Sequence, residues 1–219
     1  NGLGDVDEIE ALRAGLATSA GVEVAYHNAD MRRGDEIEDL ILQTHKRLGG
    51  PDILVNNAGI QHVAPIDEFP AERWQAIMDI ILNSAFHTIR HSLPFMKAEG
   101  WGRIINIGSA HALVASPYKS AYVAAKHGIA GLTKTVALEV ATQGITVNAI
   151  SPGYVLTPLV EQQIPDTAKA RGISEEDVKR DVLLAAQPTK NFVRVEDIGA
   201  FATFLASPAA VSINGAILT

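Results

Sequence analysis

A tyrosine and a lysine four residues apart are the side chains of this sequence best suited to moving a proton. Tyr122 and Lys126 lie in "SPYKSAYVAAKHG" (116–128), a stretch otherwise rich in alanine, serine and glycine. On a helix both would project from one face, so an ammonium could stand close to a phenol. A nearby cation favours the phenolate and lowers a tyrosine pKa from its unperturbed value of about 10. The pair could therefore act as an acid and base, although this spacing alone more often forms a solvated face.

Hydrophobic periodicity predicts helices and strands in alternation. Helices are expected over 6–21 (closed by Gly21), 33–50, 71–99, 116–142 and 195–208, and strands over 22–30, 52–59, 102–109, 145–153 and 215–219. Such an alternation is typical of the α/β class. We predict a doubly wound, mostly parallel, Rossmann-like sheet with helices on both faces, forming one domain over residues 1–219.

Three turns follow the predicted strands and should meet at one edge of the sheet. They are "NNAG" (56–59), "GSAH" (108–111) and "SPG" (151–153). Ligands of open α/β sheets bind beyond the carboxyl ends of the strands. Gly59 and Gly153 would let the backbone approach a bound molecule, and Asn56 or Asn57 could tie neighbouring strand ends together. Any one of them could be an ordinary turn, but the three together predict a binding site.

Composition excludes several classes of function. The 219 residues contain no cysteine, which removes disulfides, thiolate nucleophiles and cysteine zinc sites, and we predict no metal site. A formal net charge of −7 argues against nucleic acid as a partner. The sequence shows neither a membrane-spanning apolar run nor a secretory signal pattern, so we expect a cytoplasmic protein with no membrane partner.

The order of "NNAG", Ser109, "YVAAK" and "SPG" resembles the short-chain dehydrogenase/reductase family, and the resemblance covers nearly the whole chain. It implies hydride transfer between NAD and a small 3-hydroxy acid, with D-3-hydroxybutyrate giving acetoacetate, by a homotetramer. Tyr122 would be the acid/base, and Ser109 would hold the substrate oxygen. Lys126 would lower the tyrosine pKa and hold the nicotinamide ribose.

The resemblance also implies two sets of binding residues. The NAD set is Leu3, Asp30, Met31, Asn57, Ala58, Gly59, Tyr122, Lys126, Pro152, Gly153, Val155 and Thr157. The set for the small carboxylate substrate is Gln61, Ser109, His111, Lys119, Tyr122 and Gln163. An ammonium with neutral donors suits a small carboxylate. Because the segment over 154–192 is too long for an ordinary connection, we interpret it as a mobile lid over the substrate.

Two features depart from the family pattern. The family opens with a strand, a glycine-rich turn and a helix that receive the cofactor pyrophosphate, whereas this sequence begins at "NGLGD". We therefore expect that about thirty residues of a first βαβ unit, and a C-terminal tail, lie outside it, and that it folds poorly without them. Ile81 stands where the family has an asparagine, and Asn83 would face the other way on a regular helix.

Other functions stay open on the sequence alone. Near "NGLGD" no arginine or lysine could meet a 2′-phosphate and Asp5 would repel one, which favours NAD over NADP. Within the family, a 3-oxoacyl thioester reductase or a sugar-alcohol dehydrogenase is possible. A nucleotide-independent lyase similar to haloalcohol dehalogenases would pair its tyrosine with arginine, so Lys126 argues against it. Ile81 would fit an inactive dinucleotide sensor, but Ser109, Tyr122 and Lys126 argue for an enzyme.

Overall fold

The computed structural model describes residues 1–2 and 4–219, apart from the side chain of Leu159. The first half contains α1 (Val6–Ala20), α2 (Gly34–Leu48), β1 (Ile53–Asn56), α3 (Ala71–Met78), the π-helix η1 (Asp79–Asn83), α4 (Ser84–Glu99) and β2 (Gly102–Ile107). The second contains η2 (Ala110–Ala112), α5 (Ser120–Glu139), β3 (Ile145–Ile150), α6 (Pro158–Glu161), α7 (Gln163–Arg171), α8 (Glu175–Asp177), the π-helix η3 (Val178–Leu183), α9 (Val195–Ala206), η4 (Pro208–Ala210) and β4 (Ile217–Leu218).

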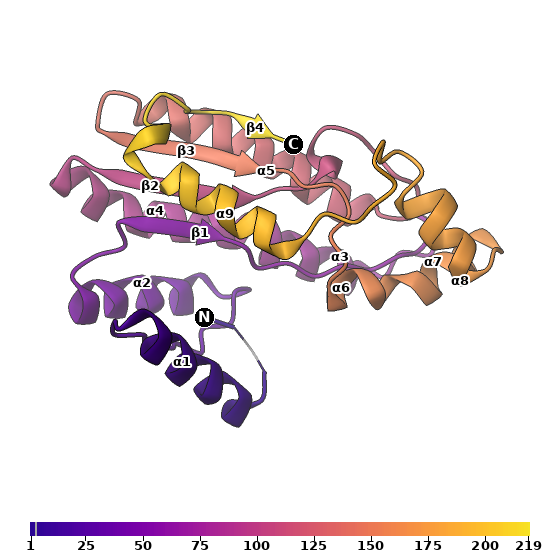
Figure 1. Cartoon of the computed structure of the whole chain (residues 1–219), viewed down its shortest axis with the longest axis horizontal. Helices are drawn as coiled ribbons and strands as arrows, with labels where there is room; N and C mark the ends of the chain where they lie inside the picture. Colours follow the sequence, from indigo (N-terminus) through magenta and orange to yellow (C-terminus); the bar gives the residue numbers. More distant parts are fainter. Residues whose placement is uncertain (3) are drawn as a thin grey trace.

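The strands form one parallel sheet in the order β1, β2, β3, β4 (Figure 1). Asn56 at the end of β1 is opposite Asn106 of β2, and Ile107 at the end of β2 is opposite Ile150 of β3. Parallel strands in register end at the same edge, so the three predicted turns emerge side by side. The α/β class with a parallel sheet is confirmed.

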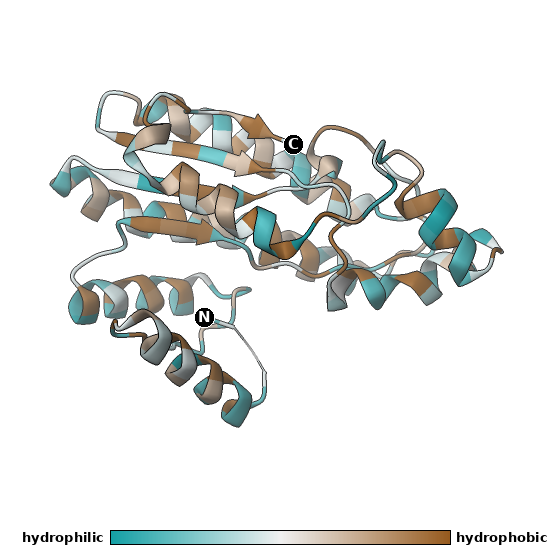
Figure 2. Ribbon diagram, in the orientation of Figure 1, coloured by the Kyte–Doolittle hydropathy of each residue, from teal (hydrophilic) through white to brown (hydrophobic). Residues whose placement is uncertain are grey.

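Helices cover both faces of the sheet because successive strand residues point to opposite sides. Ile104 packs with Ile89 of α4 and Val136 of α5 on one face. Its neighbour Ile105 packs with Leu205 of α9 on the other. The strands accordingly form apolar bands between the helical layers (Figure 2).

Helix ends follow the sequence signals closely. Asp5 caps α1 by accepting bonds from the backbone of Asp7 and Glu8, and Gly21 ends the helix at a φ of 65°. Gly49 ends α2 in the same left-handed region, at a φ of 96°. The helix expected to reach Thr142 stops at Glu139, within the usual error at a frayed end.

The strand predicted over 22–30 is wrong. The hydrogen bonds of this segment run to side chains instead: Arg13 donates to the carbonyl of Val24 at 2.9 Å, and the amide of Asp30 donates to Glu36 at 2.8 Å. No strand within the described residues pairs with it. A strand needs the backbone of a neighbour, so an apolar alternation is not sufficient to form one.

The segment over 154–192 folds as short helices, α6 to η3, with a small core of its own. Ile164, Ala168, Val178 and Leu183 are buried together, and Tyr154 packs against them. The residues of α8, Glu175–Asp177, are all acidic, and the ribbon around them is coloured as hydrophilic (Figure 2). Across residues 1–2 and 4–219, no helix is both long and apolar enough to cross a membrane.

Candidate active site

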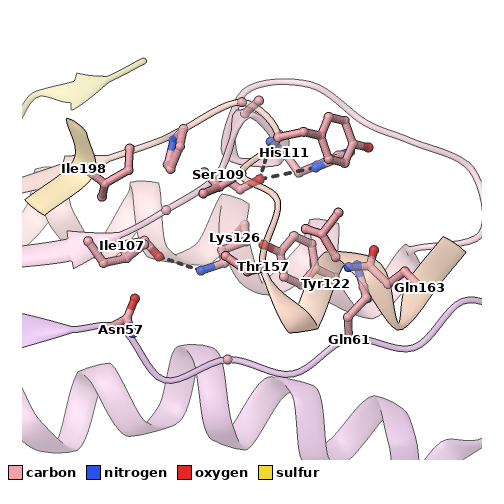
Figure 3. Close-up of a pocket in the computed structure, with 18 of the residues that line it drawn as sticks. Asn57, Gln61, Ile107, Ser109, His111, Tyr122, Lys126, Thr157, Gln163 and Ile198 are labelled. Atoms are coloured by element: carbon pink, nitrogen blue, oxygen red, sulfur yellow. Dashed lines mark hydrogen bonds between the residues drawn. The ribbon is translucent and has the colours of Figure 1, made fainter. Parts of the chain in front are cut away.

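The three strand-end turns line a cavity of about 670 Å³ (Figure 3). Its walls also receive the start of α5, the beginning of the 154–192 segment and the first turn of α9. The lining residues are Asn57, Ala58, Gly59, Gln61, Ile107, Gly108, Ser109, Ala110, His111, Lys119, Tyr122, Lys126, Pro152, Gly153, Tyr154, Val155, Thr157, Pro158, Val160, Gln163, Val195 and Ile198.

The end of β2 is held tightly enough to fix Ser109. The amide of Gly108 donates to the carbonyl of Ile150 at 2.7 Å, and the amide of Ala110 donates to that of Pro152 at 2.9 Å. A Cβ on Gly108 would lie 2.5 Å from the hydroxyl of Ser151, so the close approach requires glycine. Ser109 then caps η2 by accepting the backbone N–H of His111.

Small residues on α5 let the catalytic helix pack closely. Ala121 and Ala125 are fully buried against η1 and α3, in a cluster that includes Ile81 and Tyr122. A Cβ on Gly128 would lie 2.7 Å from Leu82. The alanine-rich composition of the predicted helix thus allows close packing. Tyr122 and Lys126 project from this helix into the cavity (Figure 3).

Burial raises the pKa of the Tyr122 phenol, and a hydrogen bond with Ser109 only partly opposes this. The ammonium of Lys126 lies 5.5 Å from the centre of the tyrosine ring. The lowered tyrosine pKa expected beside Lys126 is therefore wrong in direction, because desolvation of the phenolate is the largest influence on this group. Tyr122 rests as a neutral phenol, the form that donates a proton.

Lys126 is buried and donates to the backbone carbonyl of Ile107 at 2.5 Å. Burial lowers the pKa of its ammonium to about 8. It therefore still carries a positive charge at neutral pH. The bond to the end of β2 aims that charge at the region between Tyr122 and Asn57 (Figure 3).

A second group of polar side chains lies on the other side of Tyr122. The ring of His111 lies 6.0 Å from the tyrosine ring, with its Nδ1 3.3 Å from the hydroxyl of Ser109. Burial lowers the pKa of His111 to about 4, so the imidazole is neutral at pH 7. Lys119 is also buried, which lowers its pKa to about 8. An ammonium beside a neutral imidazole is a suitable partner for a small carboxylate.

Asn56 ties the strand ends together, as the sequence suggested it or Asn57 could. Its side-chain amide donates to Asn106 of β2 at 2.8 Å and its oxygen accepts from Thr88. Asn106 in turn donates to Thr133 of α5 at 2.9 Å. This buried network couples β1, β2, α4 and α5, while Asn57, one residue later, lines the cavity.

The helix that carries Ile81 contains a π-bulge, η1 over Asp79–Asn83. Such a bulge could turn Asn83 toward the site, but Asn83 is exposed and donates to Asp79 at 2.7 Å. Ile81 is buried in the cluster that contains Tyr122, with its side chain next to Gly59. An apolar side chain therefore occupies the place where the family resemblance leads us to expect an amide.

Comparison with known proteins agrees with this arrangement. A family model described as Enoyl-(Acyl carrier protein) reductase matches residues 4–219. The chain is 57% identical to D-beta-hydroxybutyrate dehydrogenase of Rhizobium meliloti (strain 1021), over 98% of this chain and 83% of that protein. It is 55% identical to D-beta-hydroxybutyrate dehydrogenase of Cupriavidus necator, over 99% of this chain and 83% of that protein. The chain belongs to the short-chain dehydrogenase/reductase family.

Solved structures place the chain in the same family. The crystal structure of sorbitol-6-phosphate 2-dehydrogenase from Erwinia amylovora superimposes with a TM-score of 0.89 at 28% identity, covering 98% of this chain and 84% of the other. The parallel sheet, its flanking helices and the strand-end cavity are thus those of a short-chain dehydrogenase, and the chain is an oxidoreductase of that family.

Most of the residues predicted from the family pattern meet in the cavity. All of the substrate set lines it. Of the NAD set, Asp30 and Met31 do not line it, and Leu3 lies outside the described residues. Asp30 is held by Arg32, which lowers the pKa of its carboxyl to about 2.

The sequence analysis missed Tyr154 and Arg171. Tyr154 lines the cavity, stacks edge-on to His111 at 6.1 Å and lies 5.4 Å beneath the ammonium of Lys119. Arg171 acts on both groups electrostatically, lowering the pKa of Lys119 and opposing the rise in that of Tyr154. The position of Tyr154 directly after "SPG" was a usable signal, whereas nothing in the sequence pattern singled out Arg171.

The side of the cavity around Lys126 suits the nicotinamide and ribose of a nicotinamide cofactor. An ammonium, an amide and a hydroxyl, from Lys126, Asn57 and Thr157, line it together. A Cβ on Gly59 would meet no atom closer than 3.9 Å, so a ligand can approach the backbone there. These groups match the hydroxyls of a ribose and the carboxamide of a nicotinamide.

Proposed function

We propose that this protein is an NAD-dependent dehydrogenase that interconverts D-3-hydroxybutyrate and acetoacetate. The observation that carries the proposal is one cavity with a proton-transfer group at one end and an ammonium with polar donors at the other. Ser109, Tyr122 and Lys126 form the first, and Lys119 and His111 belong to the second. The names of the relatives from R. meliloti and C. necator support this substrate.

Bound beside Lys126, NAD would supply the two-electron acceptor that takes hydride from C3 of the hydroxy acid. Asn57 and Thr157 would hold it there with Lys126. Asp30 and Met31 are predicted to contact its more distant adenosine part. The absence of a basic residue next to Asp5 favours NAD over NADP, because Asp5 would repel a 2′-phosphate.

The protein moves the proton. As the C3 hydroxyl becomes a carbonyl, the phenolate form of Tyr122 takes the hydroxyl proton, and in the reverse direction the neutral phenol returns it. Ser109, whose hydroxyl hydrogen-bonds Tyr122, would hold the same substrate oxygen. Because burial raises the Tyr122 pKa, we expect reduction to proceed readily at neutral pH and oxidation to accelerate as the pH rises.

The carboxylate of the substrate would sit at the Lys119 end. The buried ammonium supplies the charge, and the neutral His111, with Gln61 and Gln163, supplies further polar contacts. A charge-assisted hydrogen bond in a buried site is stronger than one in water. The substrate is thereby oriented with C3 toward Tyr122 and away from the lid.

The 154–192 segment is proposed as the substrate lid within a single catalytic domain. It supplies Tyr154, Val160 and Gln163 to the cavity but keeps a small core of its own, so it can move without unfolding the sheet. A cytoplasmic homotetramer completes the proposal. Light scattering of the full-length protein, which measures its molar mass in solution, tests whether it is a tetramer.

Activity assays separate the candidate functions. We expect the full-length protein to reduce NAD with D-3-hydroxybutyrate, much less with the L-enantiomer, and at least tenfold less efficiently with NADP. Equal kcat/KM with both cofactors would refute the cofactor assignment. Preference for a 3-oxoacyl thioester or a sugar alcohol would refute the substrate, and nucleotide-independent release of halide from a haloalcohol would refute the reaction class.

A further inference from the structure

Arg171 ends α7 and reaches the loop that presents Lys119. Its guanidinium carbon lies 5.7 Å from the centre of the Tyr118 ring, and Tyr118 directly precedes Lys119. A guanidinium over an aromatic face is attracted by the negative charge of the ring. The last turn of a lid helix therefore contacts the side chain of the residue that directly precedes the buried Lys119.

Tyr118 has an unusual backbone for this contact. Its φ is 68°, a left-handed value that a bulky side chain rarely adopts. The surrounding structure holds it there, because its carbonyl accepts the amide of Ala64 at 3.0 Å. Residues kept in sparsely populated conformations cluster at functional sites. Here the strained backbone lets Lys119 be buried while the Tyr118 ring meets Arg171.

Arg171 and Lys119 are two nearby cations that could share one anion. Arg171 makes no ion pair with an acidic side chain among residues 1–2 and 4–219. Its Nε is buried and has no hydrogen-bond partner there. Its charge contributes, after burial, to the lowered pKa of Lys119. A buried donor without a partner, beside a second cation, is satisfied best by a carboxylate.

Tyr154 links this pair to the core of the lid. Its ring lies 5.4 Å beneath the Lys119 ammonium, and the residue packs against the lid cluster that contains Ile164 and Ala168 of α7. Arg171 also acts electrostatically on the Tyr154 phenol. The lid helix thus meets Tyr154 of the cavity wall and the Lys119 loop, while Arg171 itself is not among the residues that line the cavity.

We propose that Arg171 is the lid's own contact for the substrate carboxylate, which would bind between it and Lys119 and fasten α7 to the loop over 116–119. The identity of the substrate rests on the proposed function. Without an anion the two cations repel each other across the lid boundary. A bound carboxylate attracts both cations. An acidic substrate would therefore close the lid over the cavity, whereas a neutral one would not.

Arg171→Gln tests the kinetic part, with Lys169→Gln as the matched control. Lys169 is an exposed cation in the same last turn of α7, so both variants lose the same favourable charge at the helix end. We expect Arg171→Gln to raise KM for D-3-hydroxybutyrate about tenfold while kcat changes less than threefold, as for lost binding of a charged group. The methyl ester should be unaffected, and Lys169→Gln should match the parent.

A second readout does not depend on turnover. Butyrate is an unreactive carboxylate of the same length, and it should protect Lys179 of the lid from cleavage by a lysine-specific protease, whereas butyramide should not. Arg171→Gln should abolish this protection, and Arg171→Lys should retain part of it because the charge remains but the planar fork is lost. Melting curves of each variant exclude unfolding as the cause.

Three results would overturn the proposal. One is an equal rise in KM for the acid and for the ester. Another is butyrate protection that survives Arg171→Gln in full. The third is protection by butyramide as strong as that by butyrate. If the parent fails to oxidise D-3-hydroxybutyrate with NAD, the proposed function fails separately, and the butyrate experiment still decides the role of Arg171.

Discussion

The two ends of the cavity are built in different ways. The residues of the proposed catalytic end are held by regular elements of the sheet and its helices. Ser109 follows β2, and Tyr122 and Lys126 project from a 20-residue helix that packs through buried alanines. The proposed carboxylate end joins the Lys119 loop to the short helices of the proposed lid, which share a small core. The first is fixed by apolar packing and backbone hydrogen bonds, and the second by polar groups and charges.

This difference assigns different roles to the two ends. A group held rigidly before the substrate arrives can stabilise the transition state selectively, so its loss lowers kcat. A charge whose arrangement is completed by the substrate contributes equally to ground and transition states, so its loss raises KM. The predictions below test that division, from the largest expected effect to the smallest.

Tyr122→Phe should lower kcat about a thousandfold or more while leaving NAD binding near normal, because the ring remains and only the transferable proton is lost. Tyr26→Phe is the control, since that phenol is exposed and donates to the carbonyl of Gly2, outside the cavity. Steady-state rates and NAD titration by fluorescence measure the two quantities. Activity of Tyr122→Phe within tenfold of the parent would disprove its role.

Ile81→Asn should raise kcat about ten- to a thousandfold with KM nearly constant, because an amide there could hold a water that carries the proton from Lys126 to solvent. Ile81 now packs in the cluster that contains Tyr122, and the exposed Asn83 cannot replace that amide. Solvent isotope effects on kcat, measured as a proton inventory, would report whether this proton transfer from Lys126 to solvent limits the rate. An unchanged or lower kcat would show that the relay uses another route.

Ile77→Asn is the control for this variant. Ile77 is fully buried in the same cluster as Ile81 but, unlike Ile81, does not lie next to Gly59 of the cavity wall. Both substitutions bury an amide, which costs about 1–3 kcal/mol of unfolding free energy if the amide stays unpaired. Only Ile81→Asn should increase kcat, whereas both variants should have a lower melting temperature than the parent.

Much of the catalytic end was predictable because its residues lie on regular elements. The spacing of Tyr122 and Lys126 follows helical geometry, and strand ends in register bring "NNAG", "GSAH" and "SPG" together. Only the direction of the Tyr122 pKa was wrong. Sequence spacing places a cation near a phenol but does not report how completely both are withdrawn from water.

The carboxylate end and the N-terminal segment were less predictable for different reasons. Arg171 meets Tyr118, next to Lys119, only through the packing of short lid helices and an unusual backbone at Tyr118, and neither has a periodic signature. The segment over 22–30 carries a strand pattern but lacks a paired strand among the described residues. The local sequence shows a preference for extended backbone, but a strand forms only when a neighbouring strand is available to pair with it.

Lys119→Ala should raise KM for D-3-hydroxybutyrate about ten- to a hundredfold and change kcat little, because it removes a charged partner of the carboxylate used throughout the reaction. Lys134→Ala is the matched control, an exposed lysine on the same side of the sheet at α5. Steady-state kinetics with the acid and its methyl ester measure the effect. If the ester served the parent as well as the acid, the carboxylate pocket would be misassigned.

The pH dependence should separate the two ends without a mutation. Burial, and then the charge of Arg171, hold the Lys119 pKa at about 8, so its ammonium is charged below that pH and loses its charge as the pH rises through it. Of the other groups that face it, His111 has a pKa of about 4 and is already neutral, and the pKa values of Tyr122 and Tyr154 are raised by burial.

Lys126 also has a pKa of about 8, but it acts on the chemistry shared by the acid and its methyl ester. The ratio of kcat/KM for the acid to that for the ester therefore isolates Lys119. Because kcat/KM reports the free enzyme, this ratio should fall up to about tenfold between pH 7 and pH 9. Arg171→Gln removes a repelling charge from Lys119, so the midpoint of the fall should move to higher pH. A ratio that stays flat over this range would mean that the Lys119 charge does not act on the carboxylate, and the contrast between the two ends would then rest on His111 and the two glutamines alone.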